Sequence, residues 1–69
     1  MQRPEELKKE IEKVIEQGDR PSVNLLAENL DWVEEDVHSC LNTLEKRGEV
    51  KTYVKEIWSR KIRFVALKR

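Results

Sequence analysis

The sequence predicts a small α+β domain in which three short helices are followed by a two-stranded antiparallel hairpin. Residues 4–47 place apolar side chains at intervals of three and four, which is the repeat of amphipathic helices. Residues 50–67 are instead rich in β-branched and aromatic residues, which favour strands. Gly48 separates the two regions, and a chain of 69 residues has room for one core of modest size. We therefore expect a single domain over residues 1–69.

The first helix is expected near residues 4–17. Pro4 suits the first position of a helix, and the acids that follow it complement the positive end of the helix dipole. Gly18 offers a left-handed cap at the other end. The apolar stripe of this helix is narrow, which favours packing on the other helices over a coiled-coil partner. It consists of Leu7, Ile11, Val14 and Ile15.

The second and third helices are expected near residues 23–30 and 34–47. Ser22 or Asn24 is the expected N-terminal cap of the second helix, and Asp31 tolerates the left-handed backbone of a tight turn. Seven apolar residues of the three helices are expected to be buried together: Ile11, Ile15, Leu26, Leu30, Val37, Leu41 and Leu44.

Two further apolar residues lie near the expected turn. Trp32 follows the turn and is expected to pack in the core rather than to stack on a ligand. Leu25 points away from Leu26 and Leu30, so it either packs under the first helix, which we favour, or marks a contact surface.

The hairpin is expected to consist of strands 50–57 and 61–67, joined around Trp58, Ser59 and Arg60. The turn contains no glycine, so its type does not follow from the sequence. Both faces of the hairpin carry apolar residues, and alternation alone does not decide which face covers the helices. The other face is open as a homodimer seam or as a patch that binds another protein.

Residues 26–50 resemble the helix-turn-helix of winged-helix DNA-binding domains of the transcription-regulator type. The resemblance rests on the spacing of apolar residues and on the glycine after the third helix: Leu26, Ala27, Leu30, Trp32, Val37, Leu41, Leu44 and Gly48. With the preceding helix and the following hairpin it covers nearly the whole chain. It implies an α+β winged helix-turn-helix fold that binds double-stranded DNA, with the third helix in the major groove and the hairpin as the wing. Two positions depart from the pattern, because relatives usually have Gly in place of Asp31 and a basic residue in place of Ser39.

Residues 37–48 also match the spacing of winged helices that bind Z-form nucleic acid. Those domains have Asn, Arg and Tyr where this chain has His38, Ser39 and Asn42. They also have a Pro-Pro pair that is missing before Trp58. The sequence therefore does not support that specialised function.

The net charge of zero hides a strong segregation of charge along the chain. Residues 46–69 contain nine basic residues and two acids, a net charge of +7, whereas residues 1–45 carry −7. The positive part coincides with the expected wing, and such a surface attracts phosphate backbones. Lysine also protects the edges of β-hairpins, which is the simpler explanation of the same pattern.

The candidate DNA contacts come from the third helix and the hairpin. Asn pairs with adenine, Ser and Thr bond to several bases, and Lys reaches guanine or phosphate. An aromatic residue at the wing tip suits stacking on a base or wedging against sugars. On the third helix the candidates are His38, Ser39, Asn42, Thr43 and Lys46. On the hairpin they are Lys51, Lys55, Trp58, Arg60, Lys61 and Arg63.

The start of the third helix opposes this assignment. Acids at positions 34–36 fill the turn that enters the major groove in many such domains. Residues 19–45 hold one basic residue, Arg20, against seven acids. The three acids also have a structural explanation, because Val33 cannot cap the helix and negative charge favours its N-terminal end. The alternative function is a winged-helix module that binds another protein and not DNA.

The sequence gives no support to an enzymatic function. His38 is the only histidine and Cys40 the only cysteine, so no cluster has zinc spacing, and no glycine-rich loop suits phosphate. We expect no metal and no cofactor. A lone cysteine, together with the lack of a signal-peptide pattern or a long apolar run, predicts a cytoplasmic protein. The 41% of charged residues, rich in Lys and Glu, is typical of thermophilic proteins.

Overall fold

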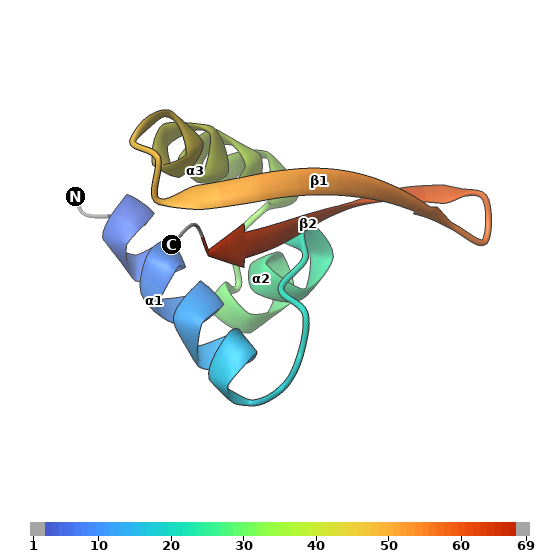
Figure 1. Ribbon diagram of the computed structural model, residues 1–69, viewed down its shortest axis with the longest axis horizontal. Helices are drawn as coiled ribbons and strands as arrows, with labels where there is room; N and C mark the ends of the chain where they lie inside the picture. Colours follow the sequence, from blue (N-terminus) through green and yellow to red (C-terminus); the bar gives the residue numbers. More distant parts are fainter. Residues whose placement is uncertain (1–2, 68–69) are drawn as a thin grey trace.

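The computed structural model describes residues 3–67, which form three helices followed by an antiparallel hairpin (Figure 1). The elements are α1 (Arg3–Glu16), α2 (Val23–Leu30), α3 (Glu34–Lys46), β1 (Val50–Ile57) and β2 (Arg60–Leu67). This confirms the predicted α+β class and is consistent with winged-helix topology. The first and third helices each end one residue earlier than expected. The second strand begins at Arg60 rather than Lys61, because only two residues form the turn.

The ends of the helices follow from local chemistry. The Ser22 hydroxyl accepts a hydrogen bond from the backbone N–H of Leu25 at 3.2 Å, so Ser22 and not Asn24 caps α2. Asp31 takes the left-handed conformation, with φ of 56°, between α2 and α3. Val33 stands at the N-cap of α3 without a side-chain hydrogen bond, as expected. The three acids of the first turn therefore supply the favourable charge at this helix end.

The core lies where the three helices meet the base of the hairpin. Its buried members are Leu7, Ile11, Val14, Val23, Leu26, Ala27, Val37, Cys40, Leu41, Leu44, Val50 and Val65. The expectation was wrong for Ile15 and Leu30, which are only partly buried at the margin of this cluster. Leu25 and Trp32 pack against it in the same way, and the Arg3 guanidinium lies 4.6 Å from the centre of the Trp32 ring. Trp32 therefore belongs to the core margin rather than to an open stacking surface.

The pairing of the strands decides which face of the hairpin is inside. Val50 pairs with Leu67 and Thr52 with Val65, and the buried Val50 and Val65 place this face against the helices. We call it the inner face, and it consists of Val50, Thr52, Val54, Glu56, Lys61, Arg63, Val65 and Leu67. The alternate residues form the outer face: Lys51, Tyr53, Lys55, Ile57, Arg60, Ile62, Phe64 and Ala66.

The base of the hairpin is fixed and its far end projects beyond the helices (Figure 1). The backbone N–H of Val65 donates to the carbonyl of Pro21 at 2.9 Å, and Ser22 forms an isolated β-bridge with Phe64. The loop between α1 and α2 thus adds a third, minimal strand contact to the hairpin. A single bridge residue has no strand pattern, so the sequence could not predict this contact. By contrast, every residue from 53 to 61 is exposed. Among residues 3–67, no helix has the length and apolar character needed to cross a membrane.

Candidate nucleic-acid interface

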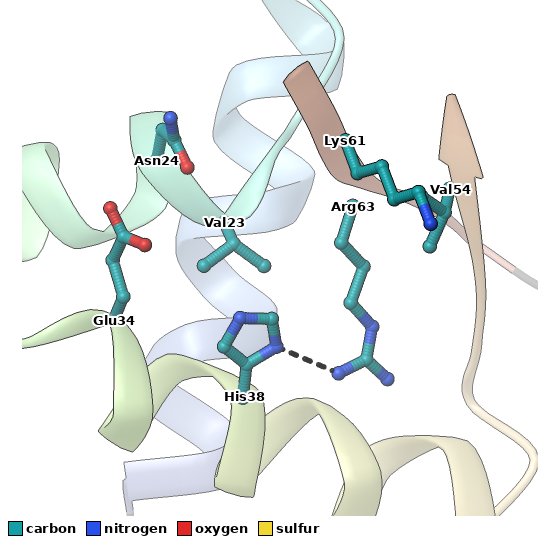
Figure 2. A pocket seen from close by; sticks show the side chains of 7 residues that line it. All are labelled: Val23, Asn24, Glu34, His38, Val54, Lys61 and Arg63. Atoms are coloured by element: carbon teal, nitrogen blue, oxygen red, sulfur yellow. Dashed lines mark hydrogen bonds between the residues drawn. The ribbon is translucent and has the colours of Figure 1, made fainter. Parts of the chain in front are cut away.

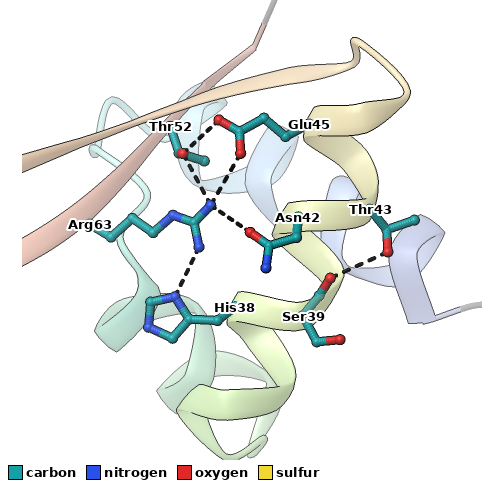
Figure 3. A network of polar contacts seen from close by, with 7 residues as sticks. All are labelled: His38, Ser39, Asn42, Thr43, Glu45, Thr52 and Arg63. Carbon is teal, nitrogen blue, oxygen red and sulfur yellow. Dashed lines mark hydrogen bonds and ion pairs between the residues drawn. The ribbon is translucent and has the colours of Figure 1, made fainter.

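Arg63 joins the wing to the exposed side of α3 (Figure 3). Its Nη1 lies 3.0 Å from His38 Nδ1, and its Nη2 donates to Asn42 Oδ1 at 3.0 Å and to Thr52 Oγ1 at 3.1 Å. Nη2 also forms an ion pair with Glu45 Oε1 at 3.3 Å. Because Nη2 has two hydrogens for three acceptors, at least one of these bonds is shared. We call these five side chains the Arg63 network.

The Arg63 network specifies the protonation of His38. A guanidinium only donates hydrogen bonds, so the contact at Nδ1 requires a neutral imidazole whose proton is on Nε2. The Thr52 hydroxyl receives one bond from Arg63 and donates its own proton to Glu45 Oε2 at 2.9 Å. Every polar contact around the guanidinium therefore has a consistent direction.

This arrangement gives Arg63 a positioning role. Its side chain is only 17% exposed, whereas Lys55, Arg60 and Lys61 are exposed residues. The guanidinium directs Nη1 and Nη2 at four acceptors, so among the described residues only its Nε–H and one Nη1–H have no partner. Of the three neighbouring cations on β2, Arg60 and Lys61 therefore present their charge to solvent and Arg63 does not.

The predicted DNA contacts on α3 differ in how exposed they are and in whether their polar atoms already have partners. Ser39 and Lys46 are exposed, and Thr43 donates its hydroxyl proton back to the Ser39 carbonyl at 3.3 Å. Asn42 is exposed, yet its carbonyl oxygen accepts from Arg63, as Figure 3 shows. Within residues 3–67 the amide nitrogen of Asn42 makes no hydrogen bond, so it is the donor that remains for a base or phosphate.

A cleft of about 450 Å³ opens between the start of α2, the start of α3 and the wing (Figure 2). It is lined by Val23, Asn24, Glu34, His38, Val54, Lys61 and Arg63. The cations of β2 stand on one side and the Glu34 carboxylate on the other. Charges of opposite sign that face each other across an open cleft do not select one class of small ligand.

The wing tip combines an exposed aromatic ring with basic residues. Trp58 is 94% exposed, and Arg60 and Lys61 follow it two and three residues later. Trp58 and Ser59 have φ of 53° and 63°, and two positive φ values in a two-residue loop are those of a type I′ turn. This conformation costs free energy in residues other than Gly, Asn or Asp. The tip therefore holds a large apolar side chain in solvent on a strained backbone.

The acidic start of α3 is partly neutralised. Asp36 forms an ion pair with Arg3 at 3.2 Å, with both side chains more than one third exposed. Glu34 and Glu35 are exposed on the surface. Two of the three acids thus remain as negative charge close to the expected DNA-reading face.

The single cysteine, Cys40, is buried in the core. Burial raises the pKa of the Cys40 thiol and so favours its neutral form. Among the described residues, no three His, Cys, Asp or Glu side chains gather to hold a metal ion.

No protein-family model matches the chain, and neither a curated protein nor a solved structure shows significant similarity to it.

Proposed function

We propose that this protein is a winged-helix domain that binds double-stranded DNA, as a transcriptional regulator does, and that the wing leads the contact. The observation that carries the proposal is the projecting hairpin end, where Lys55, Arg60, Lys61 and the 94% exposed Trp58 are presented to solvent together. Cations on a protruding element gain affinity by releasing counterions from the DNA backbone. The proposal assigns no catalytic role to any residue.

The charge of α3 favours an approach that is tilted toward the wing. Glu34 and Glu35 at its start repel phosphates, and a Debye length of about 8–10 Å screens this only in part. Lys46 lies at the other end of the helix, and Ser39 and Asn42 lie between. The later turns of α3 are therefore the better candidates for contact, with Arg63 holding the wing beside them.

The wing can be tested by removing its exposed charge. We expect Lys55→Gln, Arg60→Gln and Lys61→Gln together to weaken binding to random duplex DNA at least about ten-fold at low salt. The matched control replaces Lys9, Lys13 and Arg20, three exposed cations outside the wing, by Gln. It loses the same charge and should bind within about two-fold of wild type. Equal losses in both variants would show that only net charge matters and would refute a wing-led contact.

A second candidate function is favoured by the exposed acids of α3. Glu34 and Glu35 would suit a basic protein partner, and the domain would then bind no DNA. Glu35→Gln separates the two proposals by sign. It should tighten duplex binding if DNA is the ligand, because a repulsive charge is removed. It should weaken the complex with a basic protein if that is the partner.

A further inference from the structure

The outer face of the hairpin is a surface without an acidic residue. It presents Lys51, Lys55 and Arg60 around an apolar centre, and its eight residues carry a net charge of +3. The single acid of the paired strands, Glu56, belongs to the inner face. The outer face lies opposite the face that packs on the helices. It shares Lys55 and Arg60 with the duplex contact proposed above, whereas Lys51, Tyr53 and Phe64 have no part in that contact.

Two aromatic rings lie at the centre of this outer face. Tyr53 and Phe64 pair across the strands, with ring centres 5.7 Å apart and planes inclined by 21°. Tyr53 is 39% exposed and Phe64 is partly buried, and neither belongs to the buried core. The Lys55 ammonium lies 5.9 Å from the centre of the Tyr53 ring. At that distance the contact is weak, and a flexible exposed lysine leaves it readily for a phosphate.

Charge decides what can cover this face. A second copy would bring the same three cations against these in a symmetric dimer, because such an interface pairs a patch with itself. A polyanion instead gains from every one of them. Lys51 and Lys55 stand on either side of Tyr53, about 7 Å from it along the strand. Positive charge thus alternates with an aromatic ring.

We infer that the outer face binds single-stranded DNA, with bases stacked on Tyr53 and Phe64 and phosphates held by Lys51, Lys55 and Arg60. Stacking requires the flat faces of the bases, which a duplex hides and a single strand exposes. A platform of this kind tolerates any sequence, because every base has a π-face. The inference is separable from duplex binding, because Tyr53, Phe64 and Lys51 serve the single strand alone, while Lys55 and Arg60 are shared by both contacts.

The test uses the full chain and a short fluorescently labelled oligo(dT), with anisotropy as the readout. Tyr53→Leu keeps an apolar side chain on the strand but removes the ring, and should weaken oligo(dT) binding about five-fold or more. Duplex binding should stay within about two-fold. The matched control is Val54→Ala, at a neighbouring exposed position on the inner face. It should leave oligo(dT) binding within about two-fold of wild type.

A second readout needs no variant. In wild-type protein the ring protons of Tyr53 and Phe64 should shift upfield in NMR spectra as oligo(dT) is added. The inference is overturned if these signals do not move, or if Tyr53→Leu and Val54→Ala bind oligo(dT) equally well. Binding of oligo(rU) more than about ten-fold tighter than binding of oligo(dU) would overturn the assignment to DNA, because these two differ only in the 2′-hydroxyl. Loss of duplex binding alone would affect the proposed function and leave this inference intact.

Discussion

The Arg63 guanidinium donates to acceptors on α3 and β1 from its place on β2, and so ties three elements together. Lysine cannot reproduce this, because a single ammonium lacks the planar fork that reaches several acceptors at once. Arg63 therefore helps to set the angle between the wing and α3, together with the packing of Val50 and Val65 against the helices. A DNA contact that uses both the wing and α3 would therefore be affected by a change at Arg63.

We expect Arg63→Lys to lower the free energy of unfolding by about 1–2 kcal/mol, since several charge-assisted hydrogen bonds are lost around a largely buried group. Urea denaturation followed by circular dichroism measures the change. Arg60→Lys, at an exposed position of the same strand, is the control and should change stability by less than about 0.5 kcal/mol. If both variants are equally stable, Arg63 does not position the wing.

The individual candidate residues could be predicted from the sequence, but their connections could not. His38, Asn42 and Arg63 were each expected to contact DNA because of their side-chain chemistry. Their mutual hydrogen bonds depend on which hairpin face is inside, and both faces carry apolar residues. The buried Val65 settles this, since Arg63 lies two residues before it on the same face. No local sequence pattern shows which face of the hairpin packs against the helices.

Among the connections between elements, the turn of the wing carries the most backbone strain. Trp58 and Ser59 both have positive φ, a conformation that Asn-Gly adopts at much lower cost. The sequence contains neither Asn nor Gly here, so the type I′ turn could not be predicted. The two-residue length and the pairing of Ile57 with Arg60 follow only from the structure.

We expect Ser59→Gly to stabilise the domain by about 1 kcal/mol, because it removes the strain of a left-handed residue. Adding Trp58→Asn should stabilise it further but weaken duplex DNA binding, since the exposed ring is lost. Thermal denaturation and anisotropy titrations measure the two effects. A Trp58→Asn, Ser59→Gly variant that binds DNA as well as Ser59→Gly would exclude a contact by Trp58.

The first turns of α1 are clamped to the corner between α3 and β1. Arg47 pairs with Glu5 at 3.0 Å, and Lys8 pairs with Glu49 at 2.6 Å. A hydrogen bond from its own backbone N–H, together with the Arg47 guanidinium, lowers the pKa of the Glu5 carboxyl. The hydrogen bond to Glu49 raises the pKa of Lys8. Local sequence patterns do not predict such ion pairs, because the two partners are about forty residues apart in the sequence.

The lowered pKa of Glu5 gives a pH dependence with a definite sign. Its stabilising contribution is present above the pKa of the unfolded chain and is lost as the pH falls through the folded-state pKa. Glu5→Gln should therefore destabilise the domain at neutral pH, and the difference from wild type should shrink in acid. Urea midpoints at several pH values test this, with Glu16→Gln at the other end of α1 as the control. A difference that is constant with pH would contradict it.

For the whole molecule, stability rests on one small core in which α3 is central. Leu41 is fully buried, and its sequence spacing alone was sufficient to predict this. We expect Leu41→Ala to cost about 2–5 kcal/mol, a large share of the stability of a domain this size. Chemical denaturation measures the loss. A cost below about 1 kcal/mol would mean that the three helices do not share this core.

The charge of the whole chain is divided between the helices and the wing, and this division supports the account of function. The half with a net charge of +7 contains the hairpin, and the half with −7 contains nearly all of the three helices. Sequence alone predicted this segregation and the three-helix-plus-hairpin order. It did not predict that Arg63 is used inside the fold while Arg60, the other arginine of the strands, is exposed.

The salt dependence of duplex DNA binding tests the wing-led contact most directly. Plotted as log affinity against log salt concentration, wild-type binding should fall with a slope of about −3 or steeper, since each phosphate contact contributes about −0.9. Replacing Lys55, Arg60 and Lys61 by Gln should make the slope shallower by about 2–3. The Lys9, Lys13 and Arg20 control should leave the slope unchanged. Binding that is undetectable at low salt, or a slope that the wing variant does not alter, would contradict the proposed function.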